Sequence, residues 1–433
     1  MKWIIPLFLL VSVASYSQTF GTIATFSSFG GPNCLIQGSD GNFYGANTSV
    51  FEVTPSGEIT TIVGNLKAIA SSLLQASDGT LYGVSQESIF KILPGGVVSV
   101  LDTSQLIGLP NPGAVLNSII QGSDGNFYGT ATQGGSSANS STFGFGTVFK
   151  MTPDGALTVL HNFSGPDGER PQAGLIQGAD GNFYGTTEYG GANTTGTCFI
   201  KNADAEGCGT VFKITPSGSL TTLHSFNGND GKSPSVLIQA NDGNLYGIAE
   251  GGGQYGEVYR LTPSGLLNTL YAFGPTADDG ADPQFLLQAT DRNLYGATLK
   301  GGNPACPNLS GYGPGCGTIF QLTLAGTLTT LFDFPPGYDL PPGQDTVSAA
   351  VTALFQATDG NLYGSVELPG GAVFKLTLAP PTTVYGAALA PGYAGLYQVA
   401  IQIPATLANG DYPVVATING AQSPSTTMIT VQQ

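Results

Sequence analysis

Short apolar runs separated by polar, glycine-containing turns follow one another along most of this chain. In one copy, Leu175–Gln177 is an apolar run, Asp180-Gly181-Asn182 follows it, and Phe183–Thr187 resumes the apolar pattern. Aspartate can accept a hydrogen bond from the backbone two residues on, and glycine adopts positive φ at little cost, so the tripeptide predicts a tight hairpin. Two further runs, Val211–Thr215 and Leu220–Phe226, flank a Pro-Ser-Gly turn. This pattern predicts four antiparallel strands.

The four-strand unit occurs seven times. Its hairpin turns begin at Asp40, Asp78, Asp124, Asp180, Asp242, Asp291 and Asp359. The apolar run before each turn ends in a glutamine, at Gln37, Gln75, Gln121, Gln177, Gln239, Gln288 and Gln356. One such sheet has two apolar faces that its neighbours must cover, and a closed ring leaves none exposed. The sequence therefore predicts an all-β fold, a seven-bladed β-propeller of four-stranded antiparallel blades.

The last copy has only three of its four strands. The segment Ile23–Phe29, IATFSSF, matches the fourth-strand block LTTLHSF position for position. We therefore expect the N-terminus to complete the last blade, while an alternative takes Thr382–Tyr385 as that strand. On this basis the propeller is predicted to span residues 18–380, and a small C-terminal β module to span residues 381–433.

The N-terminus has the composition of a secretory signal peptide. Residues 1–17 carry one lysine, an apolar run from Trp3 to Val13, and small residues that suit cleavage before Gln18. The run is shorter than the roughly 20 residues of a membrane-spanning helix, so an anchor is the weaker interpretation. We expect a secreted or cell-surface protein with no integral membrane segment after cleavage.

Charge and donor groups argue against several classes of ligand. The chain has 28 acidic and 12 basic residues and a net charge of -16, which would repel nucleic acid and anionic membranes. The aspartate in each hairpin supplies too few oxygen ligands for calcium. We therefore expect no nucleic-acid partner, no metal and no cofactor.

The composite pattern LIQGSDGNFYGTT...GG...GTVFKMTPDG...TVLHNFSG, which extends over roughly Thr19 to Pro380, resembles the choice-of-anchor tandem repeat family called GloVer. The segment Ala390–Gly420, which begins APGYAGLYQ, resembles part of the C-terminal module of secreted Solibacter-type acidobacterial proteins. These resemblances imply export and a place on or outside the cell. They transfer no activity to particular residues.

Several polar residues occupy fixed positions of the repeat, which favours structural roles. His161 and His224 share one position, which Tyr271 and Phe332 fill in the next two blades, so it is predicted to be an aromatic packing position. The seven glutamines are expected to bond to the adjacent hairpin or to the next blade. A third-strand position is basic in five copies, at Lys91, Lys150, Lys213, Arg260 and Lys375.

Four of the five cysteines form two equally spaced pairs. Cys198 and Cys208, and likewise Cys306 and Cys316, are ten positions apart in the same loop of their blades. In an exported protein this spacing predicts two disulfides, with a zinc site as the alternative. Cys34 is expected to be a free, buried thiol.

The loops of variable length all lie on one predicted face, because strand directions alternate within a blade. Function concentrates on variable loops held by a rigid scaffold. The candidate ligand-binding residues on this face are Glu188, Tyr189, Glu250, Tyr255 and Glu367. We expect a non-enzymatic binding module for an extracellular glycan or protein. The alternative is a propeller glycoside hydrolase or lyase that uses the loop carboxylates, although no catalytic residue is assigned.

Overall fold

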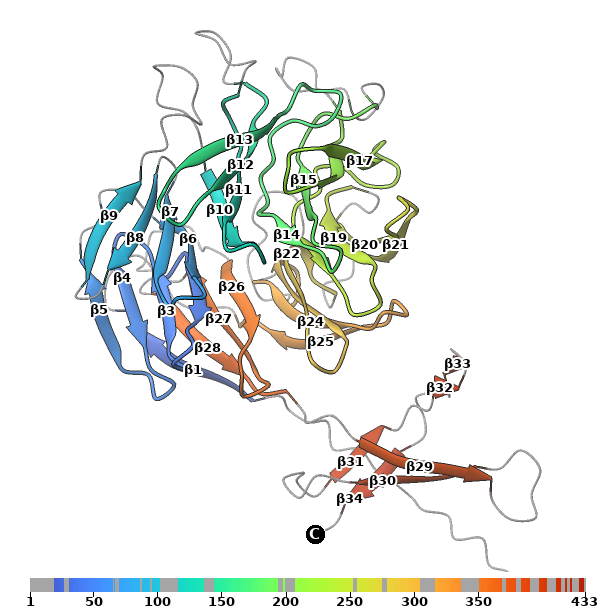
Figure 1. The fold of residues 1–433 in the computed structure, drawn as a ribbon. Coiled ribbons are helices and arrows are strands. Elements are labelled where there is room, and N and C mark those ends of the chain that lie inside the picture. Colours follow the sequence, from blue (N-terminus) through green and yellow to red (C-terminus); the bar gives the residue numbers. More distant parts are fainter. Residues whose placement is uncertain are drawn as a thin grey trace, which may run out of the picture. The chain divides into compact units, whose positions relative to one another are not determined.

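Seven four-stranded antiparallel sheets form a ring in the computed structural model, which confirms the predicted seven-bladed β-propeller (Figure 1). The structure describes residues 19–26, 31–64, 66, 70–85, 88–93, 96–101, 116–135, 144–193, 198, 207–251, 255–274, 279–303, 316–335, 350–367 and 371–378, and the backbone of six strands within 383–431. The predicted signal peptide, residues 1–17, lies outside this description. Among the described residues, no helix is long and apolar enough to cross a membrane.

Each blade begins with an inner strand that faces the centre of the ring and continues into a second strand. The inner strands are β2 (Cys34–Gln37), β6 (Ala70–Gln75), β10 (Leu116–Gln121), β14 (Ile176–Gln177), β18 (Leu237–Gln239), β22 (Ala281–Gln288) and β26 (Ala350–Gln356). The second strands are β3 (Phe43–Ala46), β7 (Leu81–Ser85), β11 (Phe127–Ala131), β15 (Phe183–Thr187), β19 (Leu245–Ala249), β23 (Leu294–Lys300) and β27 (Leu362–Glu367).

The third and fourth strands complete each blade toward the outside of the ring. The third strands are β4 (Val50–Val53), β8 (Ile89–Leu93), β12 (Thr147–Met151), β16 (Thr210–Ile214), β20 (Glu257–Leu261), β24 (Thr318–Leu322) and β28 (Ala372–Leu376). The outer strands are β5 (Ile59–Val63), β9 (Val97–Leu101), β13 (Leu157–Asn162), β17 (Leu220–Ser225), β21 (Leu267–Ala272), β25 (Leu328–Asp333) and, in the last blade, β1 (Phe20–Thr25).

The hydrophobic core lies between neighbouring blades, because each sheet is apolar on both faces. Tyr128 of one blade stacks on Phe183 of the next with ring centroids 3.9 Å apart. Within a blade, Phe212 fills the space beside Gly185, where a Cβ atom would lie 2.6 Å from the ring. This packing explains why the second strand repeats an aromatic-Tyr-Gly or Leu-Tyr-Gly sequence.

The seven glutamines form a continuous ring of hydrogen bonds, which confirms their predicted structural role. Gln177 donates from Nε2 to the carbonyl of Gly181 in its own hairpin (3.1 Å), and its Oε1 accepts from the backbone N–H of Ser123 in the preceding blade (2.8 Å). The other six make the same two kinds of bond. Thr358 of the last blade donates to Gln37 of the first, which closes the ring.

The hairpin turns have the predicted chemistry. Asn126 N–H donates to Asp124 Oδ1, and the Tyr128 hydroxyl and Lys150 ammonium bind Oδ2 of the same aspartate. Partial burial would raise the pKa of Asp124, but hydrogen bonds from Tyr128 and Asn126, supported by Lys150, outweigh it and lower the pKa to about 2. Arg292, which replaces the turn glycine of the sixth blade, adopts the same left-handed conformation with φ of 70°.

The N-terminal strand closes the ring, but its predicted register was wrong. β1 pairs with β28 over Phe20–Thr25, so Phe20–Phe26 takes the position assigned to Ile23–Phe29. The shift is three residues. Ile23 occupies the position of Leu223, since its carbonyl packs against the turn glycine of the next blade in the same way. The alternative at Thr382–Tyr385 is also wrong, because β29 (Thr383–Leu389) pairs with β30 (Tyr397–Gln402) instead.

The chain divides into two compact units, of which Phe20–Leu376 is one. The other contains the six strands within residues 383–431. Its remaining strands are short and pair in twos, β31 (Gly410–Pro413) with β34 (Met428–Val431) and β32 (Thr417–Ile418) with β33 (Ala421–Gln422).

Deleting Thr19–Gly31 should destabilise the propeller by at least about 3 kcal/mol, because it removes an outer strand and uncovers the apolar surface that Phe20 and Ile23 cover. Thermal and urea unfolding of the shortened protein would measure this loss. The control is a chain that begins at Thr19, which should unfold like the longer protein. Equal stability of both shortened chains would contradict N-terminal closure.

Replacing Gln177 with Ala should cost about 1 to 3 kcal/mol of unfolding free energy, because the Ser123 N–H and the Gly181 carbonyl lose their partner. Urea unfolding would measure it. Gln284→Ala, at an exposed position in the bulge of β22, is the matched control and should change stability by less than about 0.5 kcal/mol.

Candidate functional site on the loop face

Three loops of sequence DGxxP cross from an outer strand to the next blade and share one backbone conformation. In the third of them, Asp282 has φ of 59° and donates its N–H to the carbonyl of Tyr255 (2.8 Å), while Pro283 packs against Gly256. The corresponding residues of the other two loops, Arg170 and Ser233, have φ of 54° and 47°. The strained residue is therefore positioned by the repeat, in a conformation that side chains other than glycine seldom adopt.

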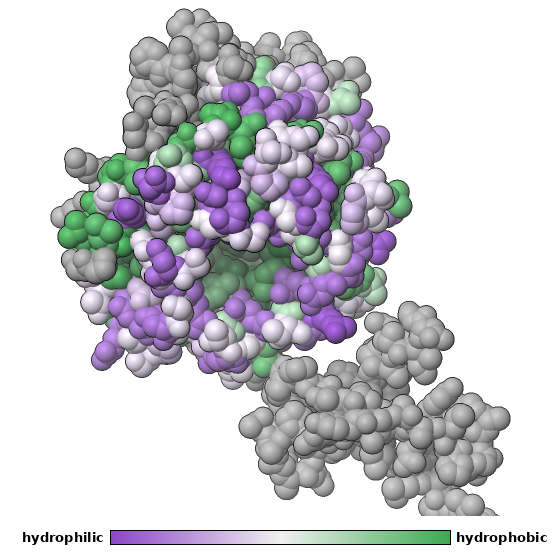
Figure 2. All heavy atoms as spheres, viewed as in Figure 1, coloured by the Kyte–Doolittle hydropathy of each residue, from purple (hydrophilic) through white to green (hydrophobic). Residues whose placement is uncertain are grey.

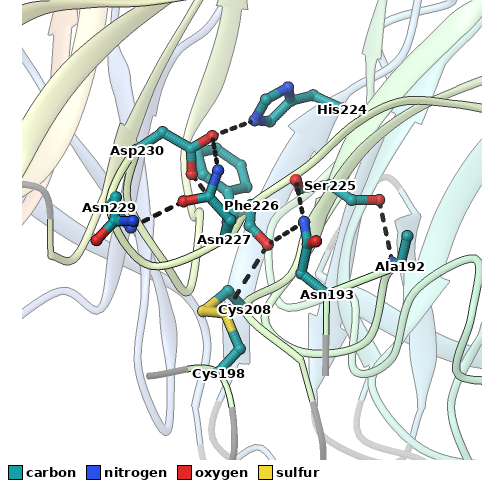
Figure 3. The surroundings of a disulfide bond; sticks show 10 residues. All are labelled: Ala192, Asn193, Cys198, Cys208, His224, Ser225, Phe226, Asn227, Asn229 and Asp230. Carbon is teal, nitrogen blue, oxygen red and sulfur yellow. Dashed lines mark hydrogen bonds and ion pairs between the residues drawn. A yellow bond between two sulfur atoms is a disulfide. The ribbon is translucent and has the colours of Figure 1, made fainter. Parts of the chain in front are cut away.

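The predicted aromatic packing position also anchors these loops, which the sequence analysis missed. His161 Nε2 lies 2.7 Å from Asp167 Oδ2, and His224 Nε2 lies 3.1 Å from Asp230 Oδ2. In the next blade the Tyr271 hydroxyl donates to the corresponding aspartate, at 2.8 Å. Figure 3 shows the second pair, with Asp230 between His224 and the backbone of its loop. The histidines thus hold loops in place, and the recurrent six-residue spacing was the available signal.

Cys198 and Cys208 form a disulfide, as predicted, with Cα atoms 4.8 Å apart and both side chains buried (Figure 3). The zinc alternative is therefore wrong for this pair. Cys316 is also disulfide-bonded, while its predicted partner Cys306 lies outside the described residues. Cys34 is free.

A polar cavity of about 400 Å³ lies on the loop face over three consecutive blades. Three of the predicted residues line it, namely Glu188, Glu250 and Tyr255. They come from the loops after β15 and β19 and from the residues just before β20. Glu188 and Glu250 occupy equivalent positions of successive blades, 62 residues apart in the sequence, and the structure brings both to one cavity.

The cavity mixes carboxylates with ammonium groups that the sequence analysis did not select. Lys300 Nζ lies 3.5 Å from Asp282 Oδ2, and Lys232 lies beside Glu250, to whose carbonyl it donates its N–H. All four residues line the cavity. The lysines and Asp282 were missed because they occupy variable positions of their loops, where the sequence gave no reason to prefer them.

The electrostatics of the cavity differ between its two glutamates. Gln172 donates its side-chain amide to Glu188, which fixes that carboxylate. Partial burial raises the pKa of Glu250, and the charges of Asp282 and Glu188 raise it further, although Lys232 lowers it. The cavity therefore offers a carboxylate held in place beside one that accepts a proton more readily.

Of the other two predicted residues, Tyr189 is not among the described residues that line the cavity. Tyr189 follows Glu188 and packs under the guanidinium of Arg170, whose Cζ lies 5.5 Å from the ring centroid. Burial and a hydrogen bond to Glu188 raise the pKa of Tyr189 to about 12. Glu367 ends β27, and its side chain lies outside the described residues.

A second hollow lies where inner strands meet, and it is largely apolar. A cavity of about 450 Å³ is lined by Ile36, Leu73 and Leu74 together with the hairpin residues around them. Figure 2 shows a hollow near the middle of the ring with hydrophobic side chains inside it and polar ones around it. The amides of the glutamine ring are already bonded to backbone groups, so they do not form a converging ligand site.

Comparison with known proteins identifies the family. The sequence model described as the Gloeobacter/Verrucomicrobia repeat matches residues 70–206 and 201–400. The chain therefore belongs to this repeat family, as its sequence pattern predicted. No match was found among curated proteins. The resemblance of Ala390–Gly420 to a Solibacter-type module stays a prediction.

Solved structures with the same fold include an enzyme and an extracellular domain. Virginiamycin B lyase from Staphylococcus aureus is similar with a TM-score of 0.58 and 18% identity, over 83% of this chain and 99% of that one. The extracellular domain of a protein from B. thetaiotaomicron described as a putative hybrid two component system has a TM-score of 0.52 and 11% identity, over 90% of this chain and 46% of that one. At these identities the similarity shows the propeller fold alone.

Cys34 should react at least about tenfold more slowly with iodoacetamide in the folded protein than after denaturation, because burial raises the pKa of its thiol to about 12. Mass mapping without reduction would follow the reaction and locate the disulfides. It should also find Cys198 joined to Cys208. Rapid labelling of Cys34 at pH 8 in the native protein would contradict the raised pKa of its thiol.

Proposed function

We propose that this protein is a secreted or cell-surface binding module and that the loop face of its propeller takes a hydroxyl-rich glycan. The observation that carries the proposal is the cavity in which Glu188, Glu250 and Tyr255 converge from successive blades. Its volume of about 400 Å³ falls within the range of small-ligand sites, about 300 to 1,000 Å³.

The side chains of the cavity suit a sugar ring. Carboxylates accept hydrogen bonds from hydroxyl groups, and lysine and glutamine side chains donate to ring and hydroxyl oxygens. Tyr255 adds a half-buried aromatic ring, which offers an apolar surface with a polar tip and little conformational freedom to lose. Glu188 is already held by Gln172, so this acceptor is preorganised for a ligand.

The disulfide supports a location outside the reducing cytoplasm. Cys198–Cys208 is a short-range bridge that constrains a loop of the ligand-bearing face. Disulfides form and persist mainly in exported proteins. This agrees with the signal peptide predicted at residues 1–17.

A second candidate function is glycoside hydrolysis at the same cavity. The observation that favours it is the raised pKa of Glu250 beside the carboxylates of Glu188 and Asp282, since a glycosidase pairs a protonated acid with an ionised carboxylate. A lyase reaction has less support. In the S. aureus virginiamycin B lyase, replacing a histidine with alanine gives a catalytically inactive protein. The two histidines of this chain both lie on outer strands and bind loop aspartates.

A screen against soluble polysaccharides and oligosaccharides should find a ligand whose affinity falls at least about tenfold in Tyr255→Ala and in Glu250→Gln, which corresponds to about 1.4 kcal/mol. The first variant removes the ring surface, and the second keeps the size of the side chain but removes its charge. Isothermal titration with each variant would measure the loss.

Ser217→Ala is the matched control, because Ser217 lies in a turn at the opposite end of the blade strands and is exposed. The affinity of the Ser217→Ala variant for the glycan should equal that of the unmodified protein. Equal affinity of all three variants would contradict the proposed site. Product analysis in the same assays separates the two candidates, since cleavage that is lost in Glu250→Gln would establish hydrolysis.

A further inference from the structure

Glu257 is an exception to the repeat at a position beneath one of the DGxxP loops. In the blades on either side, this position is Thr210 or Thr318, and its hydroxyl is hydrogen-bonded to that of Thr187 or Thr298 on the neighbouring strand. In the blade between them, the threonine pair is replaced by Ala249 and Glu257, which are opposite each other in the β19–β20 register. A carboxyl group thus occupies a place that elsewhere holds two small hydroxyls.

The Glu257 side chain is buried and only partly hydrogen-bonded. Its exposure is 1%, its Oε2 accepts from the Thr269 hydroxyl at 3.2 Å, and its Oε1 has no partner. Two residues on along β20, the hydroxyl of Tyr259 is also buried without a partner. Burying an ionised carboxylate without full hydrogen bonding is costly, so the neutral form is favoured in this position.

The carboxyl group lies directly against the backbone of the loop above it. Its Oε1 lies 2.8 Å from the point that a Cβ atom on Gly231 would occupy, and Gly231 has φ of 105°. The next residues of the loop, Lys232 and Ser233, line the proposed binding cavity. In the matching loops, Gly168 and Gly280 rest on the threonine hydroxyls instead. Of the three blades with a DGxxP loop, only this one therefore has a titratable side chain against the glycine of the loop.

We propose that Glu257 is a positioning residue of the cavity, whose neutral carboxyl keeps the loop of residues 227–234 closed and whose ionisation releases it. The groups that face it are the Tyr259 phenol on its own strand and Asp230 in the loop, which is bound to His224 of β17. The β19 strand presents Ala249 and the β21 strand presents Thr269. Among the described residues, a negative charge on Glu257 would therefore face the carboxylate of Asp230 and no cation in direct contact.

The raised pKa of Glu257 determines how opening of the loop depends on pH. Burial raises the pKa of Glu257 from its ordinary 4.5 to about 7, and Asp230 raises it while the Thr269 hydrogen bond lowers it. When the loop opens, the carboxyl reaches water and its pKa returns toward the ordinary value. Opening then releases a proton between these two values, so the opening constant rises as pH rises from 4.5 to about 7 and levels off above. Acid closes the loop.

Hydrogen exchange by mass spectrometry of the ligand-free protein tests this proposal. Rates at pH 5 to 8.5, corrected for intrinsic exchange, would be compared between residues 227–234 and the matching loops around Gly168 and Gly280. The ratio of the exchange rate in residues 227–234 to that in the matching loops should rise by up to roughly tenfold per pH unit below pH 7 and then stay constant. In Glu257→Gln, which is neutral at every pH, the ratio should be constant throughout.

The double variant Ala249→Thr/Glu257→Thr restores the threonine pair of the neighbouring blades and should also give a constant ratio, so the proposal is still tested if Glu257→Gln fails to fold. Glu58→Gln, an exposed change in a turn, should behave like the unmodified protein. A constant ratio in the unmodified protein, or the same rise in a folded Glu257 variant, would overturn the proposal. The effect of the loop on ligand binding rests on the proposed function, but the opening of the loop does not. Because the exchange experiment contains no ligand, the proposed loop opening and the proposed glycan binding can fail separately.

Discussion

The ring of glutamine side chains is the interaction on which the closed propeller depends. Each amide joins two hairpins of different blades, because its nitrogen donates to its own turn and its oxygen accepts from the turn before. A single bond of this kind contributes only about 1 kcal/mol, yet a missing partner would leave backbone groups unpaired near the centre of the ring. Since Thr358 donates to Gln37, the chain of bonds has no free end. This requirement explains why the glutamine is present in every blade.

Ring closure requires the blades to be alike at one end of their strands and leaves them free to differ at the other end. The hairpins, the turn glycines and the inner glutamines hold the ring closed and are nearly the same in every blade. The loops on the other face do not take part in closing the ring, so their sequences vary. Changes beneath these loops have the clearest consequences. Glu257 in place of a threonine and Tyr259 in place of a phenylalanine introduce buried polar atoms without hydrogen-bond partners under the cavity, where the two neighbouring blades have hydrogen-bonded threonines and apolar phenylalanines.

The cavity is a property of three blades together. Glu188 and Glu250 occupy equivalent loop positions, but Lys300 and Asp282 do not share a role with their counterparts in the neighbouring blades. A repeat scaffold sets such side chains at a fixed spacing around the ring, so small changes in single loops produce a local site while the fold stays constant. The anchoring of loop aspartates by His161, His224 and Tyr271 keeps the loops in a defined position for this purpose.

The sequence by itself determined the strands, the turn chemistry, the blade number and the first disulfide, because each depends on residues that are close together and recur. It could not determine the closing register, since apolar residues at Phe20, Ile23 and Phe26 recur every three positions and a shift by three leaves the pattern unchanged. Contacts between the chain ends decided it, with Phe20 stacked on Phe332 and Ile23 against the turn of the first blade. The cavity was likewise decided by tertiary structure. Its lysines and Asp282 lie in variable loops, and only the closed ring brings these loops side by side.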